Sequence, residues 1–425
     1  MAVEEQRLQV AIEPLVAPPD RQAAIPGSKS HTNRALVCAA LATGTSTLRG
    51  ALFADDTEAM VEALRTLGIV IDVDEAGQTM RVVGCAGVVP RSDVTIDVRQ
   101  SGTTGRFLLP MLAHGTGSIV IDGHHQLRAR PFGELTEALA TLGVRCEGDA
   151  LPITVQGGGW AGGHVHVGGS VSSQFLSGLL LSAPCANETT VIDVDGELVS
   201  APYIDLTIAT MRHFGAEVEA DDHRSFAIAN TGYVGTTIDL EPDASAASYF
   251  FAAAAITGGR VRVEGLGSHS IQGDLAFVDV LASMGAEVTQ GPDWTEVSGT
   301  GSLHGVTVDM ADFSDTAQTL AVVATFADSP TVITGIDFIR RKETDRIAAV
   351  VAELARRGID AAEDADGMTI HPGVPQPGVV ETYDDHRMAM SFALLGLIHP
   401  GIVIADPGCV AKTFPHFFAE LDQLR

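Results

Sequence analysis

Two kinds of apolar pattern alternate along the chain and predict two kinds of helix. The first kind is amphipathic and ends in glycine before a run that reads as a strand, which is typical of an outer helix. These segments span residues 58–67, 134–142, 205–214, 275–284 and 345–357. The second kind is apolar on nearly every side, which predicts a buried helix. These segments span residues 35–41, 105–113, 175–183, 246–256, 317–326 and 388–397.

Both patterns recur with a nearly constant period. The glycines that follow the amphipathic segments lie 70 to 75 residues apart, at Gly68, Gly143, Gly215, Gly285 and Gly358. A sixth amphipathic segment, residues 415–424, lies where the next unit would end. A fixed period of this kind predicts a repeated structural unit. We therefore expect an α/β fold of six βα repeats of about 71 residues, and the length of 425 residues predicts two domains of three repeats each.

The first residues of the buried helices recur at intervals of 70 to 73 residues. They are Ser30, Ser101, Ser172, Ser245, Asp315 and Asp385. Serine and aspartate are good N-cap residues, and capping alone explains their choice. If the repeats pack with like orientation, several helix N-termini converge in each domain and offer N–H groups and positive dipole ends to an anion. Capping does not explain the other polar residues that crowd these positions: Lys29, Arg34, Arg106, Gln174, Glu343, Arg346 and Arg387.

The charge of the chain restricts its partners. A formal net charge of −28 argues against nucleic acid or an anionic membrane as a partner, so any anion site must be a local cluster of cations. No apolar run approaches the roughly 18 residues of a membrane helix, and the first five residues are acidic where a signal peptide is basic. The five scattered cysteines form no CxxC, which fits reduced thiols. We therefore expect a cytoplasmic protein.

Lysine is rare in this chain and its positions are informative. There are three lysines, Lys29, Lys342 and Lys412, against twenty-three arginines. An ammonium group is compact and its pKa falls on burial, whereas a guanidinium is a planar fork that stays protonated. Each lysine stands beside hydroxyl or paired charged residues, which chance survival would not explain. The three positions therefore indicate a crowded anion site or proton-transfer chemistry.

Eight short motifs occur in order along most of the chain. They are residues 26–30 with Asn33-Arg34, 101–103 with Arg106, 128–131, 171–175, 198–200 with 202–205, 342–346, 385–390 and 411–415. Any one of them is weak. Together they make the chain, from about residue 23 to 417, similar to the 5-enolpyruvylshikimate-3-phosphate synthase family of enolpyruvyl transferases.

This resemblance implies a fold and a reaction. The fold has two domains, here 28–241 and 1–27 plus 242–425, with buried helix N-termini that converge on an interdomain cleft. The reaction transfers the enolpyruvyl group of phosphoenolpyruvate to the 5-hydroxyl of shikimate 3-phosphate and releases phosphate, by addition and elimination through a tetrahedral intermediate. It belongs to the shikimate pathway, which leads to chorismate and the aromatic amino acids, and it is inhibited by glyphosate. The resemblance implies no cofactor or metal, and we expect a monomer whose partners are the two small substrates.

The resemblance also implies roles for particular residues. Asp315 is the expected base and Glu343 the expected proton donor, with Lys342 as a third catalytic group. The expected ligands of shikimate 3-phosphate are Lys29, Ser30, Arg34, Ser172, Ser173, Gln174, Ser200, Tyr203, Asp315 and Lys342. The expected ligands of phosphoenolpyruvate are Lys29, Gly102, Arg130, Gln174, Arg346, Arg387 and Lys412.

Three positions depart from the pattern of many family members. Gln100 stands where an asparagine is common, Phe107 where a proline occurs and Phe338 where some members have an asparagine that contacts shikimate. The first two leave the sensitivity to glyphosate open, and the third leaves one substrate contact unassigned.

Other functions fit the sequence less well. Residues 27–30 lack the Gly-Lys-Ser/Thr order of a P-loop. The sibling transferase that acts on UDP-N-acetylglucosamine uses a loop cysteine, and no cysteine lies between Cys85 and Cys146. His124-His125 and the pair His164 and His166 could suggest metal ligands, but no cysteine or carboxylate follows at a metal-binding interval, so strand or surface histidines are favoured. A non-catalytic binding protein would have no reason to keep both Asp315 and Glu343.

Overall fold

The computed structural model describes residues 8–169 and 172–425. Two segments lie outside the described residues: residues 1–7, and Ser170 with Val171. The first stands at the start of one expected domain, and Val171 belongs to one of the eight motifs. Internal contacts divide the chain into two compact units. The continuous unit comprises residues 27–241, and the discontinuous unit comprises residues 1–26 and 242–425.

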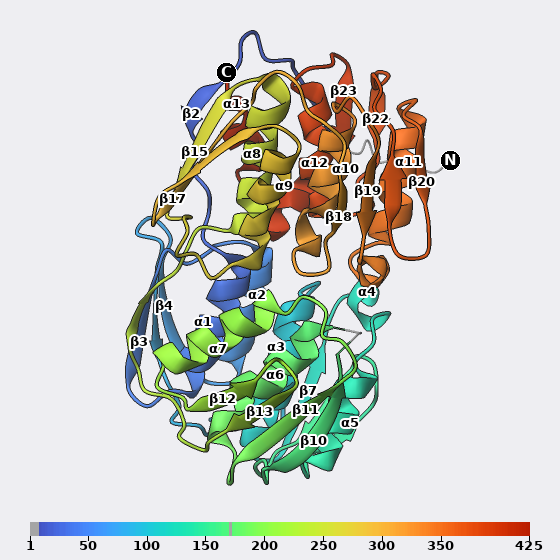
Figure 1. The fold of residues 1–425 in the computed structure, drawn as a ribbon. Coiled ribbons are helices and arrows are strands. Elements are labelled where there is room, and N and C mark those ends of the chain that lie inside the picture. The colour runs from blue at the N-terminus through green and yellow to red at the C-terminus, as the bar shows by residue number, and fades with distance from the viewer. Residues whose placement is uncertain (1–7, 170–171) are drawn as a thin grey trace, which may run out of the picture. The chain divides into compact units, whose positions relative to one another are not determined.

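The continuous unit contains three four-stranded sheets in its described part (Figure 1). Their strand orders are β14-β3-β5-β4, β6-β7-β9-β8 and β10-β11-β13-β12. In each sheet the first two strands are parallel and the remaining pairs are antiparallel. The strands are β3 (Thr45–Arg49), β4 (Val70–Asp74), β5 (Thr79–Val83), β6 (Val94–Asp97), β7 (Ser118–Asp122), β8 (Arg145–Glu147), β9 (Ile153–Gln156), β10 (Gly163–Gly168), β11 (Thr190–Asp195), β12 (Val218–Asp221), β13 (Ser225–Ile228) and β14 (Thr237–Asp239).

One buried and one outer helix accompany each of these sheets. The buried helices are α1 (Lys29–Leu41), α3 (Gly102–Met111) and α6 (Ser173–Ser182), and the outer helices are α2 (Asp55–Thr66), α5 (Gly133–Thr141) and α7 (Pro202–His213). A short helix, α4 (His125–Arg128), precedes α5. Helices α3 and α6 pack closely, because a Cβ atom on Gly178 would lie 2.3 Å from the backbone oxygen of Arg106. Glycine is therefore required where these two buried helices meet.

The discontinuous unit repeats this plan within its described residues, except that one of its sheets has three strands. Its sheets have the orders β16-β17-β15-β2, β18-β19-β21-β20 and β1-β23-β22. The strands are β1 (Gln9–Ile12), β2 (Asp20–Gln22), β15 (Arg260–Glu264), β16 (Glu287–Gln290), β17 (Trp294–Ser298), β18 (Thr307–Asp309), β19 (Thr331–Thr334), β20 (Ala361–Glu363), β21 (Met368–Ile370), β22 (Gly378–Val380) and β23 (Ile402–Ala405). The start of the chain completes two of these sheets, because β1 pairs with β23 and β2 pairs with β15.

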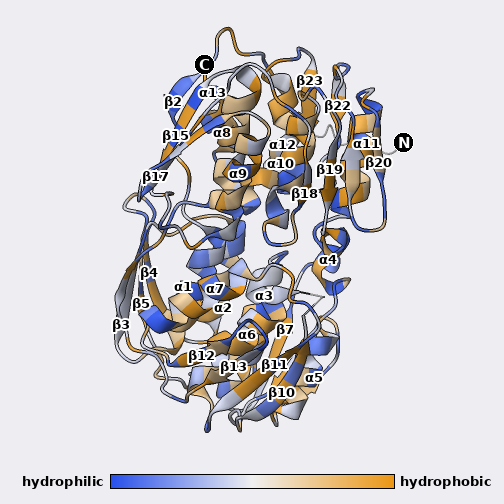
Figure 2. Ribbon diagram, viewed as in Figure 1, coloured by the Kyte–Doolittle hydropathy of each residue, from blue (hydrophilic) through white to orange (hydrophobic). Residues whose placement is uncertain are grey.

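The helices of the discontinuous unit also divide into buried and outer ones. The buried helices are α8 (Ala244–Thr257), α10 (Ala317–Ala324) and α12 (His386–Gly396), and hydrophobic residues run along all three (Figure 2). The outer helices are α9 (Phe277–Ser283), α11 (Arg346–Arg356) and α13 (Phe417–Asp422). No helix in the described part of the chain is long and apolar enough to cross a membrane. The expected α/β fold of six repeats, each with one buried and one outer helix, is confirmed.

Three of the six expected helix starts are wrong by one or two residues. Ser101, Ser172 and Asp385 are N-caps as expected. Helix α1 is capped by Ser28, so Ser30 lies in its first turn. Helix α8 is capped by Asp243, whose carboxylate accepts from the Ala246 N–H, and the hydroxyl of Ser245 donates to Asp274 instead. Asp315 lies in a 3₁₀ turn, η4 (Ser314–Thr316), and its carboxylate accepts hydrogen bonds from arginines.

Candidate active site

In the continuous unit, the starts of the three buried helices carry most of the residues expected to bind shikimate 3-phosphate. Each start is capped by a serine: the hydroxyl oxygens of Ser28, Ser101 and Ser172 accept from backbone N–H groups at 3.2 to 3.3 Å. The residues that follow these caps include Lys29, Ser30, Gly102, Ser173 and Gln174. Capping thus fixes the backbone from which the expected ligands project.

Arg34 is buried and links the backbone at Ser30 to the backbone at Tyr203. Its Nη1 donates to the backbone oxygen of Ser30 at 3.0 Å, and its Nη2 donates to the backbone oxygen of Tyr203 at 3.1 Å. Its Nε donates to Thr207 Oγ1 at 2.7 Å, and the guanidinium also lies over the Phe107 ring, 5.0 Å from the centroid. Burial lowers the pKa of Arg34 to about 10. Phe107, one of the departures from the family pattern, therefore packs against an expected substrate ligand.

Gln174 is held by a residue outside the expected set. Its carbonyl oxygen accepts from Arg106 Nη1 at 2.7 Å, and its amide nitrogen donates to Thr103 Oγ1 at 3.3 Å. The Arg106 guanidinium lies between the rings of Phe132 and Phe175, at 5.5 and 5.2 Å from their centroids. Arg106 and Thr103 therefore hold the Gln174 amide in one orientation.

Gly102 leaves space for two guanidinium groups. A Cβ atom at this position would lie 3.2 Å from Arg130 Nη1 and 3.4 Å from Arg106 Nη1. The first distance is shorter than an ordinary van der Waals contact, so a methyl group would displace Arg130 slightly. Nearby, Gln100 lines an open hollow with His124 and Arg128, and its amide nitrogen lies 3.4 Å from His124 Nδ1.

Lys29 and Ser200 show two further features of a binding site. Lys29 Nζ lies 3.6 Å from Asp56 Oδ2, and Asp56 is buried at the start of α2. Ser200 has a φ of 57°, which is uncommon for a residue with a Cβ atom, and it is 5% exposed. Such backbone strain is often found at functional sites.

In the discontinuous unit, one guanidinium joins three carboxylates. Arg346, at the start of α11, is 2% exposed. Its Nε donates to Asp385 Oδ2 at 2.8 Å, its Nη1 to Asp315 Oδ1 at 3.1 Å and its Nη2 to Glu343 Oε2 at 2.8 Å. Burial by itself lowers the pKa of Arg346, but the three carboxylates outweigh burial and the net pKa is raised.

The other oxygens of the two expected catalytic carboxylates face further cations. Asp315 Oδ2 accepts from Arg387 Nη2 at 2.6 Å, and Glu343 Oε1 lies 3.8 Å from Lys412 Nζ. The side chains of Asp315 and Glu343 remain 18% and 12% exposed. We call Arg346, Arg387, Lys412, Asp315, Glu343 and Asp385 the Arg346 cluster.

Asp385 and Phe338 make contacts that the sequence alone did not assign. Asp385 both caps α12, through its contact with the Arg387 N–H at 2.9 Å, and accepts from Arg346, so capping and the cluster share one residue. The Phe338 ring lies 5.9 Å from Lys342 Nζ, within reach of a cation–π contact. The aromatic ring thus contacts the ammonium of Lys342.

The structure brings together two subsets of the expected residues, one in each unit. Ser30, Arg34 and Tyr203 are joined by hydrogen bonds, and Asp315, Glu343, Arg346, Arg387 and Lys412 form one charged network. Sequence reasoning did not assign roles in the site to Asp56, Arg106 or Asp385, although it placed Asp385 as a helix N-cap. Arg106 and Asp385 were visible as polar residues at buried helix starts, whereas nothing in the sequence pairs Asp56 with Lys29.

Comparisons with known proteins agree with the resemblance. A sequence model of the EPSP synthase (3-phosphoshikimate 1-carboxyvinyltransferase) family matches residues 20–421. A 3-phosphoshikimate 1-carboxyvinyltransferase of Trichormus variabilis is 47% identical over 414 residues, 96% of this chain and 97% of the relative. One of Marinomonas sp. is 41% identical over 401 residues, 93% of this chain and 94% of the relative. A solved EPSP synthase of Acinetobacter baumannii is 27% identical and superposes with a TM-score of 0.83 over 98% of both chains. The chain belongs to the EPSP synthase family.

Proposed function

We propose that this chain transfers the enolpyruvyl group of phosphoenolpyruvate to the 5-hydroxyl of shikimate 3-phosphate and releases phosphate. Membership of the family supports this reaction. The observation that carries the proposal for the site is the Arg346 cluster, in which two partly exposed carboxylates lie against three cations. A substrate with phosphate and carboxylate groups needs such cations, and addition to its double bond needs a base and an acid.

In the proposed mechanism, the Asp315 carboxylate accepts the proton of the 5-hydroxyl as its oxygen attacks the substituted carbon of phosphoenolpyruvate. Glu343 donates a proton to the methylene carbon, which gives the tetrahedral adduct. Elimination then returns that proton to Glu343 as the C–O bond to phosphate breaks, and the proton taken up by Asp315 passes to the departing phosphate. Each proton transfer by a positioned group contributes about 10² to 10⁴ in rate. Lys342 beside Glu343 would stabilise the developing negative charge.

The remaining roles follow from charge and hydrogen-bonding capacity. Arg130, Arg346, Arg387 and Lys412 would bind the phosphate and carboxylate of phosphoenolpyruvate, with Gly102 leaving space for the guanidinium of Arg130. The hydroxyls of Ser172, Ser173 and Ser200 would bind the phosphate of shikimate 3-phosphate. Ser30, Arg34 and Tyr203 would bind the ring, and Lys29 and Gln174 would contact both substrates.

We propose that the two units divide this work. The continuous unit carries the residues for shikimate 3-phosphate together with Lys29, Gly102, Arg130 and Gln174, and the discontinuous unit carries the base, the acid and the remaining cations.

Phosphate release tests the proposal. We expect phosphate only when both substrates are present, and none when UDP-N-acetylglucosamine replaces shikimate 3-phosphate. Asp315→Asn should lower kcat by about 10² or more. Asp312→Asn is the matched control, because Asp312 is exposed and three residues away. Full activity of Asp315→Asn would remove the base from the mechanism, and equal turnover with the UDP-sugar would reassign the reaction.

We also propose that the enzyme works as a cytoplasmic monomer. Its five cysteines are free, and burial raises the pKa of Cys146 to about 11 and, as the main cause, that of Cys185 to about 12. Such thiols do not require an oxidising compartment. Light scattering on the purified chain should give the mass of one chain with or without both substrates; a dimer mass would contradict the proposed state.

A further inference from the structure

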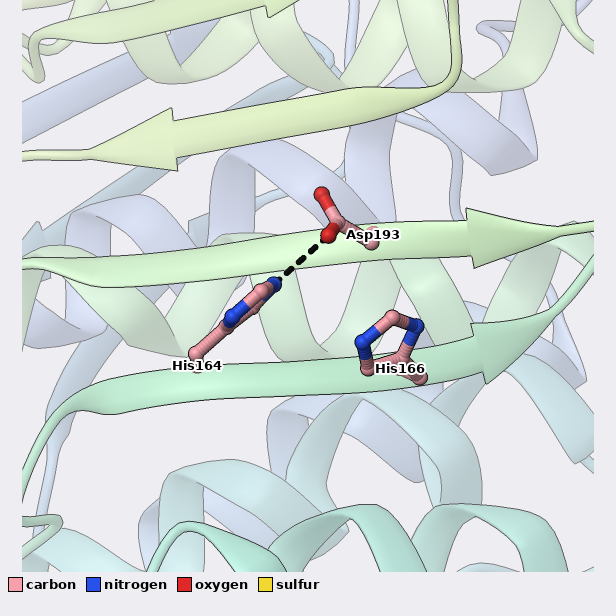
Figure 3. Close-up of side chains that lie close together, drawn as sticks. All are labelled: His164, His166 and Asp193. Carbon is pink, nitrogen blue, oxygen red and sulfur yellow. Dashed lines mark hydrogen bonds and ion pairs between the residues drawn. The ribbon is translucent and has the colours of Figure 1, made fainter.

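Two histidines and one aspartate form a compact group on the exposed face of the third sheet of the continuous unit. His164 and His166 alternate with the buried Val165 and Val167 along β10, so both histidines point to the same, exposed face. Strand β11 runs parallel to β10, and its register places Asp193 opposite His166. Figure 3 shows the three side chains gathered over these two strands.

The three side chains lie close enough together for one ion to contact all of them. One ligand atom from each of the three residues lies within 4.8 Å of the other two. His164 Nε2 lies 2.6 Å from Asp193 Oδ2, and the two imidazole centroids are 5.0 Å apart. Ligands about 2.0 to 2.2 Å from a tetrahedral Zn²⁺ are separated by roughly 3.3 Å, so small side-chain rotations suffice.

Neighbouring side chains already orient two of the three ligands. Ser225 Oγ donates to Asp193 Oδ1 at 2.6 Å, which leaves Oδ2 facing His164. Asp195 Oδ1 lies 3.2 Å from His166 Nδ1, which directs Nε2 of that ring toward a ligand. Contacts of this kind accompany most metal-ligating histidines and carboxylates.

We propose that His164, His166 and Asp193 bind a divalent transition-metal ion such as Zn²⁺, with water completing the coordination. Two imidazoles and one carboxylate suit Zn²⁺, Ni²⁺ or Co²⁺, whereas Mg²⁺ and Ca²⁺ prefer oxygen ligands alone. The ion links β10, the edge strand of its sheet, to β11. The sequence raised His164 and His166 as possible ligands but showed no carboxylate at a metal-binding interval, because Asp193 lies far from the histidines along the chain and only the parallel pairing brings it close.

Calorimetric titration of the metal-free full-length chain with Zn²⁺ tests the site. We expect saturable binding that weakens at least tenfold in His166→Gln and in Asp193→Asn. His304→Gln is the matched control, because His304 also faces an exposed aspartate, with 2.7 Å between His304 Nδ1 and Asp328 Oδ2, but lies outside the three-residue group. Unchanged affinity in both site variants would assign Zn²⁺ to another place, such as His124 and His125, and overturn the proposal.

Hydrogen exchange locates the effect on the edge strand. Zn²⁺ should slow exchange of the amides of residues 163–168 in the wild-type chain and in His304→Gln, but not in His166→Gln, and Mg²⁺ should have no such effect. Because His164 and His166 are exposed, circular dichroism of the metal-free variants should match that of the wild type. Slower exchange of these amides with Zn²⁺ in His166→Gln as well would overturn the proposed coordination. The site does not depend on the proposed catalytic function, and its test needs no substrate.

Discussion

The guanidinium of Arg387 donates from Nη2 to Oδ2 of Asp315 at 2.6 Å. This contact joins a cation proposed for phosphoenolpyruvate to the carboxylate proposed as the base. An incoming phosphate or carboxylate would compete with Asp315 for Arg387, while Arg346 keeps its contact with the other Asp315 oxygen. Binding of phosphoenolpyruvate would therefore release one oxygen of the base at the moment when a proton acceptor is needed.

Arg387→Lys tests this coupling. An ammonium cannot reach Tyr249 and Asp315 with two separate nitrogens, as the guanidinium does at 3.4 and 2.6 Å. Loss of one charge-assisted hydrogen bond lowers affinity by about 10- to 100-fold. The KM for phosphoenolpyruvate should therefore rise by that factor. Arg356→Lys is the control, since Arg356 is half-exposed and pairs with Glu353. An unchanged KM for phosphoenolpyruvate would separate Arg387 from that substrate.

Glu343→Gln separates the proton-transfer role of Glu343 from its structural role. The glutamine oxygen can still accept from Arg346 Nη2, which lies 2.8 Å from Glu343 Oε2, so the Arg346 cluster should keep its arrangement. Glutamine cannot deliver a proton to the methylene carbon, and kcat should fall by about 10² to 10⁴. Calorimetry should show shikimate 3-phosphate binding close to that of the wild type.

The matched control for this variant is Glu363→Gln, because Glu363 also accepts from an arginine, Arg340, but is exposed. It should retain wild-type kcat. If Glu343→Gln instead kept its kcat and lost substrate affinity, Glu343 would be a binding residue and the proton donor would have to be sought elsewhere.

Gly102→Ala should act through Arg130. The added methyl group lies 3.2 Å from Arg130 Nη1, so the guanidinium must shift by a few tenths of an ångström. A cost of about 1 kcal/mol would raise the KM for phosphoenolpyruvate about fivefold. The inhibitory concentration of glyphosate should rise by more, because glyphosate is the bulkier ligand. Gly408→Ala meets nothing within 4 Å and should change neither value; an unchanged glyphosate response in Gly102→Ala would place that ligand away from this turn.

The repeats were predictable from the sequence because they depend on local patterns. A helix that is apolar on every side and a helix that ends in glycine leave signals within a dozen residues, and the period then gives the number of repeats. The exact helix starts were less predictable, since several residues near a start can cap it. At α8, Asp243 caps the helix and the hydroxyl of Ser245 is engaged by Asp274, a choice set by packing.

The individual site residues were expected from motifs, but their connections were not. Arg346 binds carboxylates at two other helix starts, Asp315 and Asp385, and Lys29 lies against Asp56 of the next helix. Such contacts depend on how the repeats pack and leave no fixed spacing in the sequence. The same reason hid Asp193 beside His164.

Acid should destabilise the continuous unit through His114. Burial lowers the pKa of His114 to about 4, although a hydrogen bond between Nε2 and the Ser182 carbonyl, at 2.9 Å, opposes this. The unfolded chain binds a proton near pH 6.5, whereas the folded chain does so only near pH 4. The contribution of this group to stability is therefore complete above pH 6.5 and falls as the pH drops toward 4, by about 3 kcal/mol.

Urea unfolding at pH 7, 5.5 and 4.5 measures the slope of stability against pH. His114→Gln, whose amide can still donate to Ser182, should lose part of the slope, whereas His371→Gln, at a half-exposed histidine, should retain it. Equal slopes in His114→Gln and the wild type would show that the pKa of His114 is the same in the folded and unfolded chain. Other groups would then account for the acid sensitivity.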